Sequence, residues 1–407
     1  MQFCAQVIIM LTITKSMIEK ISKIMDLDKK EKEILSKYFK IQKANLKIKK
    51  HSYKAFRIIH NNSLGPGKGG IRYHPNVSED EVKSLSFWMS LKNSLAGLPF
   101  GGAKGGIIVD PKKLSQDELQ ELSRKYVRAF HKHMGQDKDV PAPDVYTNPQ
   151  IMSWMLDEFE KINDKKEPGF ITGKPVELGG IRLRNDSTSK GGFIIFNELA
   201  KKENIKNSRI AIQGFGNAGY FMAKHLSKNI VAVSDSSGGI YDPKGLNIDK
   251  VKNIKDEKGS VQNYSAKKIS NKELLELDID ILVLAALENQ ITKENASRIK
   301  AGYIIELANG PISNDADGIL FKKKITVIPD ILANSGGVVG SYFEWLQNKT
   351  GTGFEDSYIE RMFDQKMKET FNKVYNEYKN SKHDMRTAAY VIAIRRILDA
   401  ERLRGRI

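Results

Sequence analysis

The sequence predicts an α/β protein with two domains, and two observations support this prediction. The chain has 407 residues, which is more than one ordinary hydrophobic core organises. Beyond about residue 190, short apolar runs alternate with segments of helical periodicity, the pattern of a sheet of parallel strands covered by helices. We expect a first α/β domain over residues 1–188 and a doubly wound second domain over residues 189–384.

Composition and charge narrow the class of protein. The formal net charge is +17, but basic residues are spread among acidic ones and no zinc-finger or RNP-type motif accompanies them, so nucleic acid is not the expected partner. A positive field also attracts small anions. The single cysteine, Cys4, excludes an intrachain disulfide framework and fits a reducing compartment. No metal-ligand cluster is recognisable, so no metal is expected.

The apolar run from Val7 to Ile13 is the candidate membrane segment of the sequence. It is too short to span a bilayer, and it lacks the basic flank and cleavage site of a secretory signal. We therefore expect a cytoplasmic protein without a membrane segment.

Capping signals and periodicity predict the elements of the first half. Ser78 with Glu81, and Ser115 with Glu118, have the spacing of capping boxes, so a helix should start after each serine, the second ending near His133. The other expected elements are helices over residues 17–38 and 150–159 and strands over residues 46–59 and 107–109.

Three lysines have surroundings that are unusual for solvated side chains. Lys92 falls on a helical stripe whose other members are apolar, namely Val82, Leu85, Met89 and Ala96. Lys68 and Lys104 are each followed by Gly-Gly, which predicts turns where the backbone lets a ligand approach closely. A flexible surface turn is the alternative, but apolar residues flank the turn at Lys104. The pattern predicts three cations that converge on a small anionic substrate.

Three segments of the chain match a known family in order. They read KGGIRYHP from Lys68, MSLKNSLAGLPFGGAKGG from Met89 and DVPAPD from Asp139. The chain resembles the glutamate, leucine, phenylalanine and valine dehydrogenases from about Arg57 to its end. Family-like sequence begins only after Met17, so a native start at Met17 that leaves out residues 1–16 is a hypothesis. The resemblance implies that residues 385–407 form a helix returning to the first domain, and that the protein is a homohexamer.

The resemblance also implies roles for individual residues. Lys104 and Asp144 are the expected catalytic pair: Lys104 acts in the carbinolamine and water steps, and Asp144 transfers protons to and from the amine. Two prolines should make the loop before Asp144 rigid. Lys92 is expected to pair with the substrate α-carboxylate. Without the three lysines, a cap of a helix or turn would be the favoured explanation of Asp144.

Lys68 and Ser341 are expected to hold a side-chain carboxylate of the substrate. Family members that act on leucine, valine or phenylalanine carry apolar residues at this pair. A buried ammonium facing an apolar side chain would stay unpaired, so the pair predicts an acidic substrate. Taken alone, Ser341 is a candidate N-cap at the start of a helix.

The second domain contains a candidate phosphate-binding turn. A GxGxxG sequence lies between an expected strand, residues 209–213, and a helix, and Asp235 follows Gly214 by 21 residues after the next strand. This arrangement predicts a Rossmann-like domain that binds NAD or NADP. Further strands are expected over residues 279–285, 303–306 and 325–328. The expected cofactor contacts are Gly214, Phe215, Gly216, Asn217, Ala218, Gly219 and Asp235, together with Asn309 after a later strand and Thr188 at the domain junction.

The choice between the two dinucleotides stays open in the sequence. An anionic Asp235 disfavours a 2′-phosphate, which points towards NAD. The nearby side chains of Ser236, Ser237 and Lys244 are suitable for binding such a phosphate, which points towards NADP.

The expected activity is reversible oxidative deamination of L-glutamate to 2-oxoglutarate and ammonium with NAD or NADP. One alternative is a dehydrogenase of another amino acid, such as leucine or valine. A second is a dinucleotide-binding regulatory subunit with weak catalysis. That alternative rests on a departure from the family sequence Ala-Thr-Gly-Arg-Gly, because Ser189 replaces the glycine and is expected to restrict a hinge.

Overall fold

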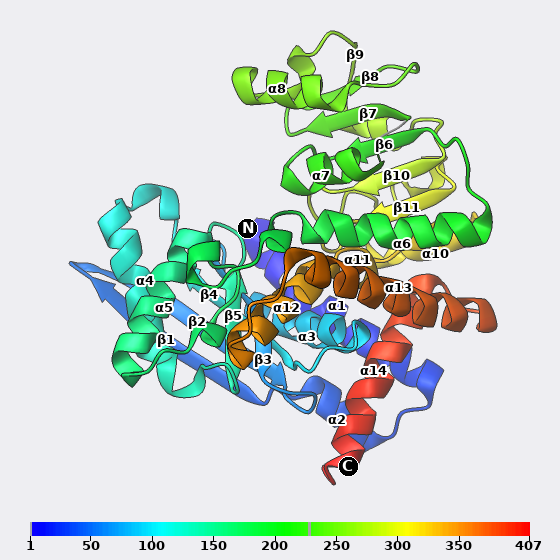
Figure 1. Cartoon of the computed structure of the whole chain (residues 1–407). Helices are drawn as coiled ribbons and strands as arrows, with labels where there is room; N and C mark the ends of the chain where they lie inside the picture. Colours follow the sequence, from blue (N-terminus) through cyan, green and yellow to red (C-terminus); the bar gives the residue numbers. More distant parts are fainter. Residues whose placement is uncertain (1, 227–228) are drawn as a thin grey trace. The chain divides into compact units, whose positions relative to one another are not determined.

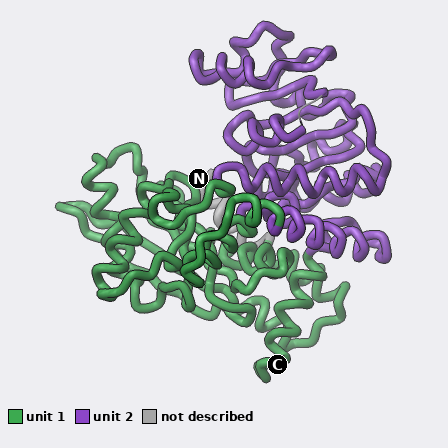
Figure 2. Tube along the Cα trace, in the orientation of Figure 1, with its two compact units in different colours: residues 1–184, 338–361, 390–407 green, residues 185–337, 362–389 purple. Residues whose placement is uncertain are grey.

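The computed structural model describes residues 2–226 and 229–407, and for residues 2–13 it describes the backbone alone. The chain forms two compact units (Figure 2). Unit 1 comprises residues 1–184, 338–361 and 390–407, and unit 2 comprises residues 185–337 and 362–389. These bounds differ from those expected, because residues 338–361 belong to unit 1 and the last helix starts within unit 2. Long helices continue across the points where the chain passes from one unit to the other, so no break in the sequence marks these points.

Unit 1 is built on a five-stranded mixed sheet with the order β1-β2-β4-β3-β5 (Figure 1). β1 pairs antiparallel with β2, and β2 with β4, whereas β3 runs parallel to both β4 and β5. The strands are β1 (Lys40–Ile48), β2 (His51–Asn61), β3 (Gly67–His74), β4 (Gly102–Ile108) and β5 (Asp139–Pro143).

Helices α4 and α5 cover one face of this sheet through an apolar core that includes Tyr126 and Met155. The helices are α1 (Gln2–Met25), α2 (Lys29–Ser36), α3 (Glu79–Leu95), α4 (Gln116–Phe130), α5 (Pro149–Asn163) and α12 (Gly336–Thr350). The predicted helix starts are confirmed: the Ser78 hydroxyl accepts from the Glu81 N–H, and Ser115 forms a full capping box with Glu118. Ser341 does not begin a helix, because it lies inside α12.

Three local predictions for unit 1 were wrong. Residues 46–59 belong to two strands of a hairpin that turns at Lys49. The first five residues of DVPAPD form strand β5 instead of a loop, and Asp144 follows the strand directly. The two Lys-Gly-Gly sequences lie in strands β3 and β4 instead of turns. Their glycines make room for protein: a Cβ at Gly105 would lie 2.2 Å from the Tyr126 hydroxyl oxygen on α4. Close packing of helix on strand therefore explains glycines that the sequence alone assigned to flexibility.

Unit 2 contains a seven-stranded sheet with the order β12-β11-β10-β6-β7-β8-β9 (Figure 1). The strands from β12 to β7 are parallel, and β8 and β9 extend that edge in antiparallel pairing. The strands are β6 (Ile210–Gln213), β7 (Ile230–Asp235), β8 (Gly238–Tyr241), β9 (Lys267–Ile269), β10 (Ile281–Leu284), β11 (Tyr303–Glu306) and β12 (Thr326–Ile328). The predicted two-domain α/β class with a doubly wound sheet is confirmed, and the β8–β9 extension was not foreseen.

Helices of unit 2 connect the parallel strands and bury an apolar core that includes Leu274, Leu284 and Leu320. They are α6 (Ser187–Glu203), α7 (Asn217–Leu226), α8 (Ile248–Lys258), α9 (Asn271–Leu275), α10 (Asn314–Lys322) and α11 (Asp330–Ala333). The last two helices are α13 (Asp356–Asn380) and α14 (Met385–Leu403), and each of them, like α12, contains residues of both units.

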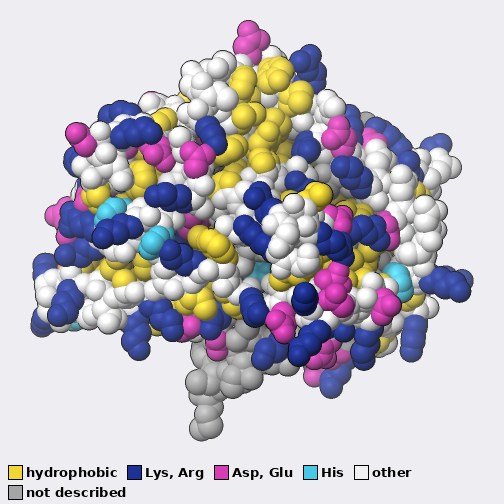
Figure 3. Space-filling model, turned by 90° about the horizontal axis from the view of Figure 1, so that it is seen from below, with side chains coloured by type: hydrophobic (Ala, Val, Ile, Leu, Met, Phe, Trp, Pro, Cys, Tyr) yellow, Lys and Arg dark blue, Asp and Glu magenta, His cyan; other side chains and the backbone are white. Residues whose placement is uncertain are grey.

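Surface charge is distributed without a single basic patch on the face drawn in Figure 3, where lysines and arginines lie over the whole outline with acidic side chains between them. Within the described chain, no helix has the length and apolarity needed to cross a membrane.

Candidate functional site

The expected catalytic pair lies on one face of the unit 1 sheet. Gly70 is level with Lys104 on β4, because Ile71 pairs with Gly105, and the pairing of β3 with β5 places Arg72 level with Asp144. Side chains on one face of a sheet recur every second residue, so Lys104, Arg72 and Asp144 project to the same side. Gly70 lies between them, and a Cβ there would be 2.9 Å from the Asp144 Cβ. The missing side chain lets Asp144 approach β3.

Lys104 and Asp144 form a direct ion pair. The Lys104 Nζ donates to Asp144 Oδ1 at 2.8 Å, and the Arg72 Nε donates to Asp144 Oδ2 at 2.7 Å. The other end of the Arg72 guanidinium binds Glu81 on the first turn of α3. Arg72 was not singled out in the sequence, although it falls at the alternating position after Lys68 and Gly70 within KGGIRYHP.

Burial and the neighbouring charges shift the protonation of this pair. Burial lowers the pKa of Lys104, with Asp144 opposing the shift and Arg72 adding to it. Burial alone would raise the pKa of Asp144, but Lys104 and Arg72 outweigh it and hold the pKa of Asp144 well below its usual range. The result is a carboxylate that stays ionised beside an amine that gives up its proton more easily than a solvated lysine.

Lys68 lies on β3 with only 1% of its surface exposed. Its Nζ donates to the Thr172 hydroxyl at 2.8 Å and to the Pro141 carbonyl at 3.4 Å, and both partners are neutral. Burial lowers the pKa of Lys68 well below its usual range; the Arg184 guanidinium adds to the shift, and Glu344 opposes it. A buried cation with neutral partners is costly, and an anionic ligand would relieve that cost.

Ser341 is buried one helical turn before Glu344 on α12. Glu344 accepts from the Gly173 N–H at 2.8 Å and pairs with Lys174 Nζ at 2.8 Å, with both side chains of that ion pair fully buried. Because Gly173 follows the Thr172 that contacts Lys68, these bonds bring the Ser341 turn of α12 to the segment that lines Lys68. Thr172, Lys174 and Glu344 were all missed in the sequence, where no spacing links them to Lys68.

Lys92 is half-buried on α3, at the edge of the face that the helix buries. Of the predicted apolar stripe, Val82 and Ala96 are buried, whereas Leu85 and Met89 are half-buried. Phe87 and Leu91, outside that stripe, are buried as well. Met89, one turn before Lys92, reaches β3, since its Cγ lies 3.3 Å from the place of a Cβ at Gly69. Lys92 therefore lies on the side of α3 that faces β3, the strand that carries Lys68.

The glycine-rich segment of unit 2 forms the predicted turn between β6 and α7. Gly214 has a φ of +93°, a backbone conformation that favours glycine. A Cβ at Gly219 would lie 1.9 Å from the Gly214 oxygen, so the third glycine allows the helix to pack on its own turn. A Cβ at Gly216 would meet no atom within 4 Å, so this glycine borders open space at the start of α7, which begins at Asn217. A helix N-terminus beside open space suits a pyrophosphate, so these residues fit a dinucleotide.

Asp235 ends β7, the strand next to β6, with its carboxylate largely enclosed. Its Oδ1 accepts from the Ser237 N–H at 2.9 Å, and its Oδ2 accepts from the Val261 N–H at 2.8 Å. Lys255 of α8, which the sequence reading missed, donates from Nζ to the Phe215 carbonyl at 2.7 Å and lies 4.0 Å from Asp235. Lys244, the lysine singled out from the sequence, is exposed in the turn after β8.

The remaining candidates also belong to unit 2. Asn309 follows β11, and its Oδ1 accepts from Asn334 Nδ2 at 3.0 Å. The Thr188 hydroxyl, on the first turn of α6, lies 3.0 Å from the place of a Cβ at Gly337. Ser189 lies inside α6 and donates to the Ala218 carbonyl at 2.8 Å. Helical backbone accepts any residue other than proline without strain, so Ser189 does not strain α6, and its effect on a hinge stays a prediction.

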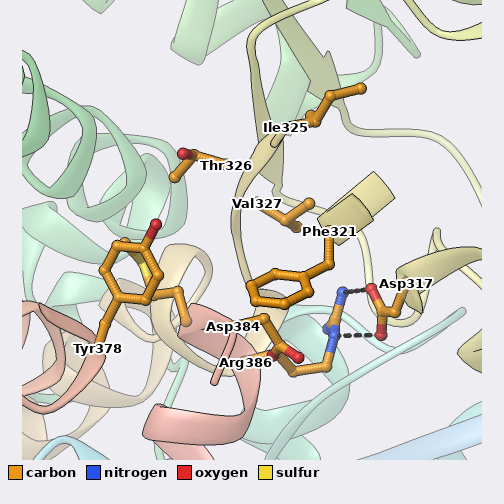
Figure 4. Close-up of a pocket in the computed structure, with 9 residues that line it drawn as sticks. Asp317, Phe321, Ile325, Thr326, Val327, Tyr378, Asp384 and Arg386 are labelled. Atoms are coloured by element: carbon orange, nitrogen blue, oxygen red, sulfur yellow. Dashed lines mark hydrogen bonds and ion pairs between the residues drawn. The ribbon is translucent and has the colours of Figure 1, made fainter. Parts of the chain in front are cut away.

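Another cluster of buried charge anchors the start of α14. Arg386 donates to both oxygens of Asp317 in the hollow shown in Figure 4, and also to both oxygens of Glu306. Asp330 contributes a further carboxylate at 3.5 Å. Burial raises the pKa of Glu306 to about 7, with Arg386 opposing and the two aspartates adding to the shift. Among the described residues, no group of His, Cys, Asp and Glu side chains has a metal-binding arrangement.

The sequence of this chain was compared with those of known protein families. Residues 179–405 match the family described as Glutamate/Leucine/Phenylalanine/Valine dehydrogenase. The chain belongs to this family. Residues 32–161 match its dimerisation domain as well. The resemblance inferred from the sequence motifs is thereby confirmed.

Individual relatives cover most of the chain. A cryptic catabolic NAD-specific glutamate dehydrogenase, GudB, of Bacillus subtilis is 49% identical over 87% of this chain and 84% of its own length. An NAD-specific glutamate dehydrogenase of Staphylococcus aureus is 48% identical over 87% of each chain.

Solved structures agree with the fold. The hetero-hexameric glutamate dehydrogenase of Thermus thermophilus in its leucine-bound form has a TM-score of 0.90 and 31% identity, over 96% of this chain and 95% of that chain. The glutamate dehydrogenase of Peptoniphilus asaccharolyticus has a TM-score of 0.87 and 36% identity, over 98% of this chain and 100% of that chain.

Proposed function

We propose that this protein catalyses the reversible reaction of L-glutamate, NAD⁺ and water to 2-oxoglutarate, ammonium, NADH and a proton. The observation that carries the proposal is the Lys104–Asp144 ion pair, together with a buried Lys68 whose hydrogen-bond partners are neutral. The pair suits proton transfer at the amino carbon, and the buried ammonium suits a second carboxylate. Relatives named NAD-specific glutamate dehydrogenases over most of the chain support the same activity.

The residues of unit 1 have separate tasks in the proposed mechanism. Lys68 and Ser341 bind the γ-carboxylate of glutamate, and Lys92 binds its α-carboxylate. Lys104, whose pKa is lowered by burial, takes a proton from the water that adds to the imine carbon and later assists collapse of the carbinolamine. Asp144, ionised beside Lys104, accepts a proton from the attacking amine in the reductive direction and returns a proton to the departing amine in the oxidative direction.

The residues of unit 2 hold the dinucleotide in the proposed mechanism. When bound, the nicotinamide accepts the hydride from Cα in the oxidative direction. The N–H groups at the start of α7 and the turn over residues 214–219 bind the pyrophosphate. Thr188 and Asn309 are proposed contacts of the nicotinamide half, and Asp235 of the adenosine ribose. Its negative charge favours NAD over NADP, because a 2′-phosphate would be repelled.

A dehydrogenase for an apolar amino acid is the competing activity, and Lys68 disfavours it. An apolar side chain would leave this ammonium buried without a counter-charge, at a cost of several kcal/mol. A binding subunit without catalysis is disfavoured by the intact Lys104–Asp144 pair. Purified protein assayed for ammonium-dependent oxidation of NADH tests all three readings: activity with 2-oxoglutarate supports the proposal, activity only with 2-oxoisocaproate supports the alternative, and dinucleotide binding without turnover supports the subunit.

We further propose a homohexamer in the cytoplasm. A related structure is described as a hetero-hexamer, and a match to the family's dimerisation domain over residues 32–161 supports self-association. Native mass spectrometry of the purified protein tests this, since six copies of the 45.9 kDa chain give a complex well separated from a dimer or trimer.

A further inference from the structure

Arg72 occupies a central position between the reacting groups of unit 1. Its Nε binds one oxygen of Asp144 at 2.7 Å, while Lys104 binds the other at 2.8 Å, so the carboxylate is divided between two cations. On its far side, Arg72 pairs with Glu81, which belongs to the first turn of α3. The four side chains form one chain of charges that alternates in sign.

We propose that Arg72 is a positioning residue, which fixes Asp144 against Lys104 and places a positive charge beside both groups. This inference rests on the proposed function, in which Lys104 and Asp144 move protons. It assigns to Arg72 no contact with the substrate. Its role is exerted through the two groups that react.

The backbone around Asp144 is held by the same strand. The Thr147 hydroxyl accepts from the Asp144 N–H at 2.7 Å and donates to the Ile71 carbonyl at 2.9 Å, and the Tyr73 N–H donates to the Val145 carbonyl at 3.0 Å. β3 thus fixes the main chain of the 144–147 turn, and Arg72 fixes the carboxylate of Asp144 at its start. A lysine at this position would supply the charge, but its donors lie on one nitrogen and would not reach Asp144 and Glu81 together as the two ends of the guanidinium do.

Arg72 and Glu81, the two members of this chain of charges beyond Asp144, have opposite effects on the pKa of Lys104. The positive charge of Arg72 lowers the pKa of Lys104, whereas the negative charge of Glu81 raises it. A purely structural ion pair predicts that removal of either charge disturbs the site in the same way. A positioning role through charge predicts shifts of opposite sign.

The test compares Arg72→Gln, Glu81→Gln and the unchanged protein by the protonation of Lys104 itself. The rate of acetylation of Lys104 by acetic anhydride, measured by mass spectrometry against pH, reports its pKa without requiring turnover. We expect Arg72→Gln to raise this pKa by about one unit and Glu81→Gln to lower it by a smaller amount. Equal values in all three proteins, or shifts in the same direction, would overturn the inference.

Kinetics separate the charge of Arg72 from its geometry. The acidic limb of kcat/KM for glutamate should move to higher pH in Arg72→Gln, and kcat near neutral pH should fall about tenfold. Arg72→Lys should restore the acidic limb but not kcat, because one ammonium cannot hold Asp144 and Glu81 together. An Arg72→Lys protein with unchanged kcat would refute the positioning role.

Failure of the inference and failure of the proposed function give different results. Without glutamate-dependent reduction of NAD⁺ by the unchanged protein, the function fails, and the acetylation data still report whether Arg72 acts on Lys104. If the unchanged protein is active and both variants titrate like it, the function stands and only the role of Arg72 is lost. Circular dichroism and thermal unfolding of each variant identify any loss that comes from misfolding.

Discussion

The substitution Lys68→Met tests whether Lys68 serves ligand binding or the stability of the fold. In the unliganded protein, Lys68 is buried with two neutral hydrogen-bond partners and a pKa that burial lowers well below its usual range, so the fold bears the cost of a desolvated charge or of losing its proton. Methionine has a similar length and no charge to desolvate. The loss of the Thr172 partner costs about 1 kcal/mol, which the relieved desolvation exceeds. We expect the free energy of unfolding to rise by about 1–2 kcal/mol.

The same substitution should damage the reaction with glutamate. Truncating one partner of a buried, hydrogen-bonded charge pair typically costs about 2–5 kcal/mol. That cost corresponds to a fall in kcat/KM of roughly 30-fold to several thousand-fold. The assays are urea unfolding of the protein without ligand, and initial rates of NAD⁺ reduction against glutamate concentration.

Lys174→Met is the matched control for this substitution. Lys174 is also a buried lysine of unit 1, but its Nζ is ion-paired with the fully buried Glu344 at 2.8 Å. Its removal leaves a buried carboxylate without that partner and should destabilise the protein by about 3–5 kcal/mol. If Lys68→Met destabilises the protein as Lys174→Met does, or leaves kcat/KM for glutamate within threefold, the assignment of Lys68 to the substrate is refuted.

Three other predictions concern the catalytic pair, the cofactor and the charge cluster. Lys104→Ala should lower kcat by about 10²–10⁴-fold with little change in NADH affinity by fluorescence titration, and turnover near that of the unchanged protein would exclude the catalytic role. Asp235→Ser should raise the ratio of NADPH to NADH activity, since the repelling carboxylate is gone; an unchanged ratio would place the choice elsewhere. The raised pKa of Glu306 means that the folded state binds a proton more tightly than the unfolded chain does, so Glu306 contributes stability that is lost as pH rises from about 5 through 7. Glu306→Gln should flatten this slope in urea unfolding measured across that range, and an equal slope would show that other groups cause it.

The parallel strands and capped helices were predictable because their signals are local. The β11 strand, Tyr303–Glu306, was predicted at its observed bounds from a short apolar run, and the start of α4 followed from Ser115 and Glu118. Local signals gave the wrong prediction for the glycines of β3 and β4, which were expected in turns and lie in strands. Their small size serves packing against α3 and Asp144, and a contact between distant segments leaves no local pattern that distinguishes it from a turn.

Site residues were recognisable where a motif contained them and unrecognisable where only the fold joins them. Lys104 and Asp144 were paired through the family resemblance, and the structure brings their side chains within 2.8 Å. Glu344 reaches the segment beside Lys68 from α12, far along the chain, and no spacing predicts that. Arg72 is different. If the segment from Lys68 had been predicted as a strand, a two-residue alternation would have placed Arg72 on the strand face that carries the proposed catalytic pair.

The proposed activity is tested most directly by one comparison of substrates. NADH oxidation by the purified protein is followed with ammonium and either 2-oxoglutarate or 2-oxoisocaproate, at equal concentrations. The Lys68 environment and the Lys104–Asp144 pair predict turnover with 2-oxoglutarate and a kcat/KM at least 100-fold lower with 2-oxoisocaproate, a ratio of about 2.7 kcal/mol in transition-state binding. Equal or better turnover with 2-oxoisocaproate, or none with either acid while NADH still binds, would contradict the proposal.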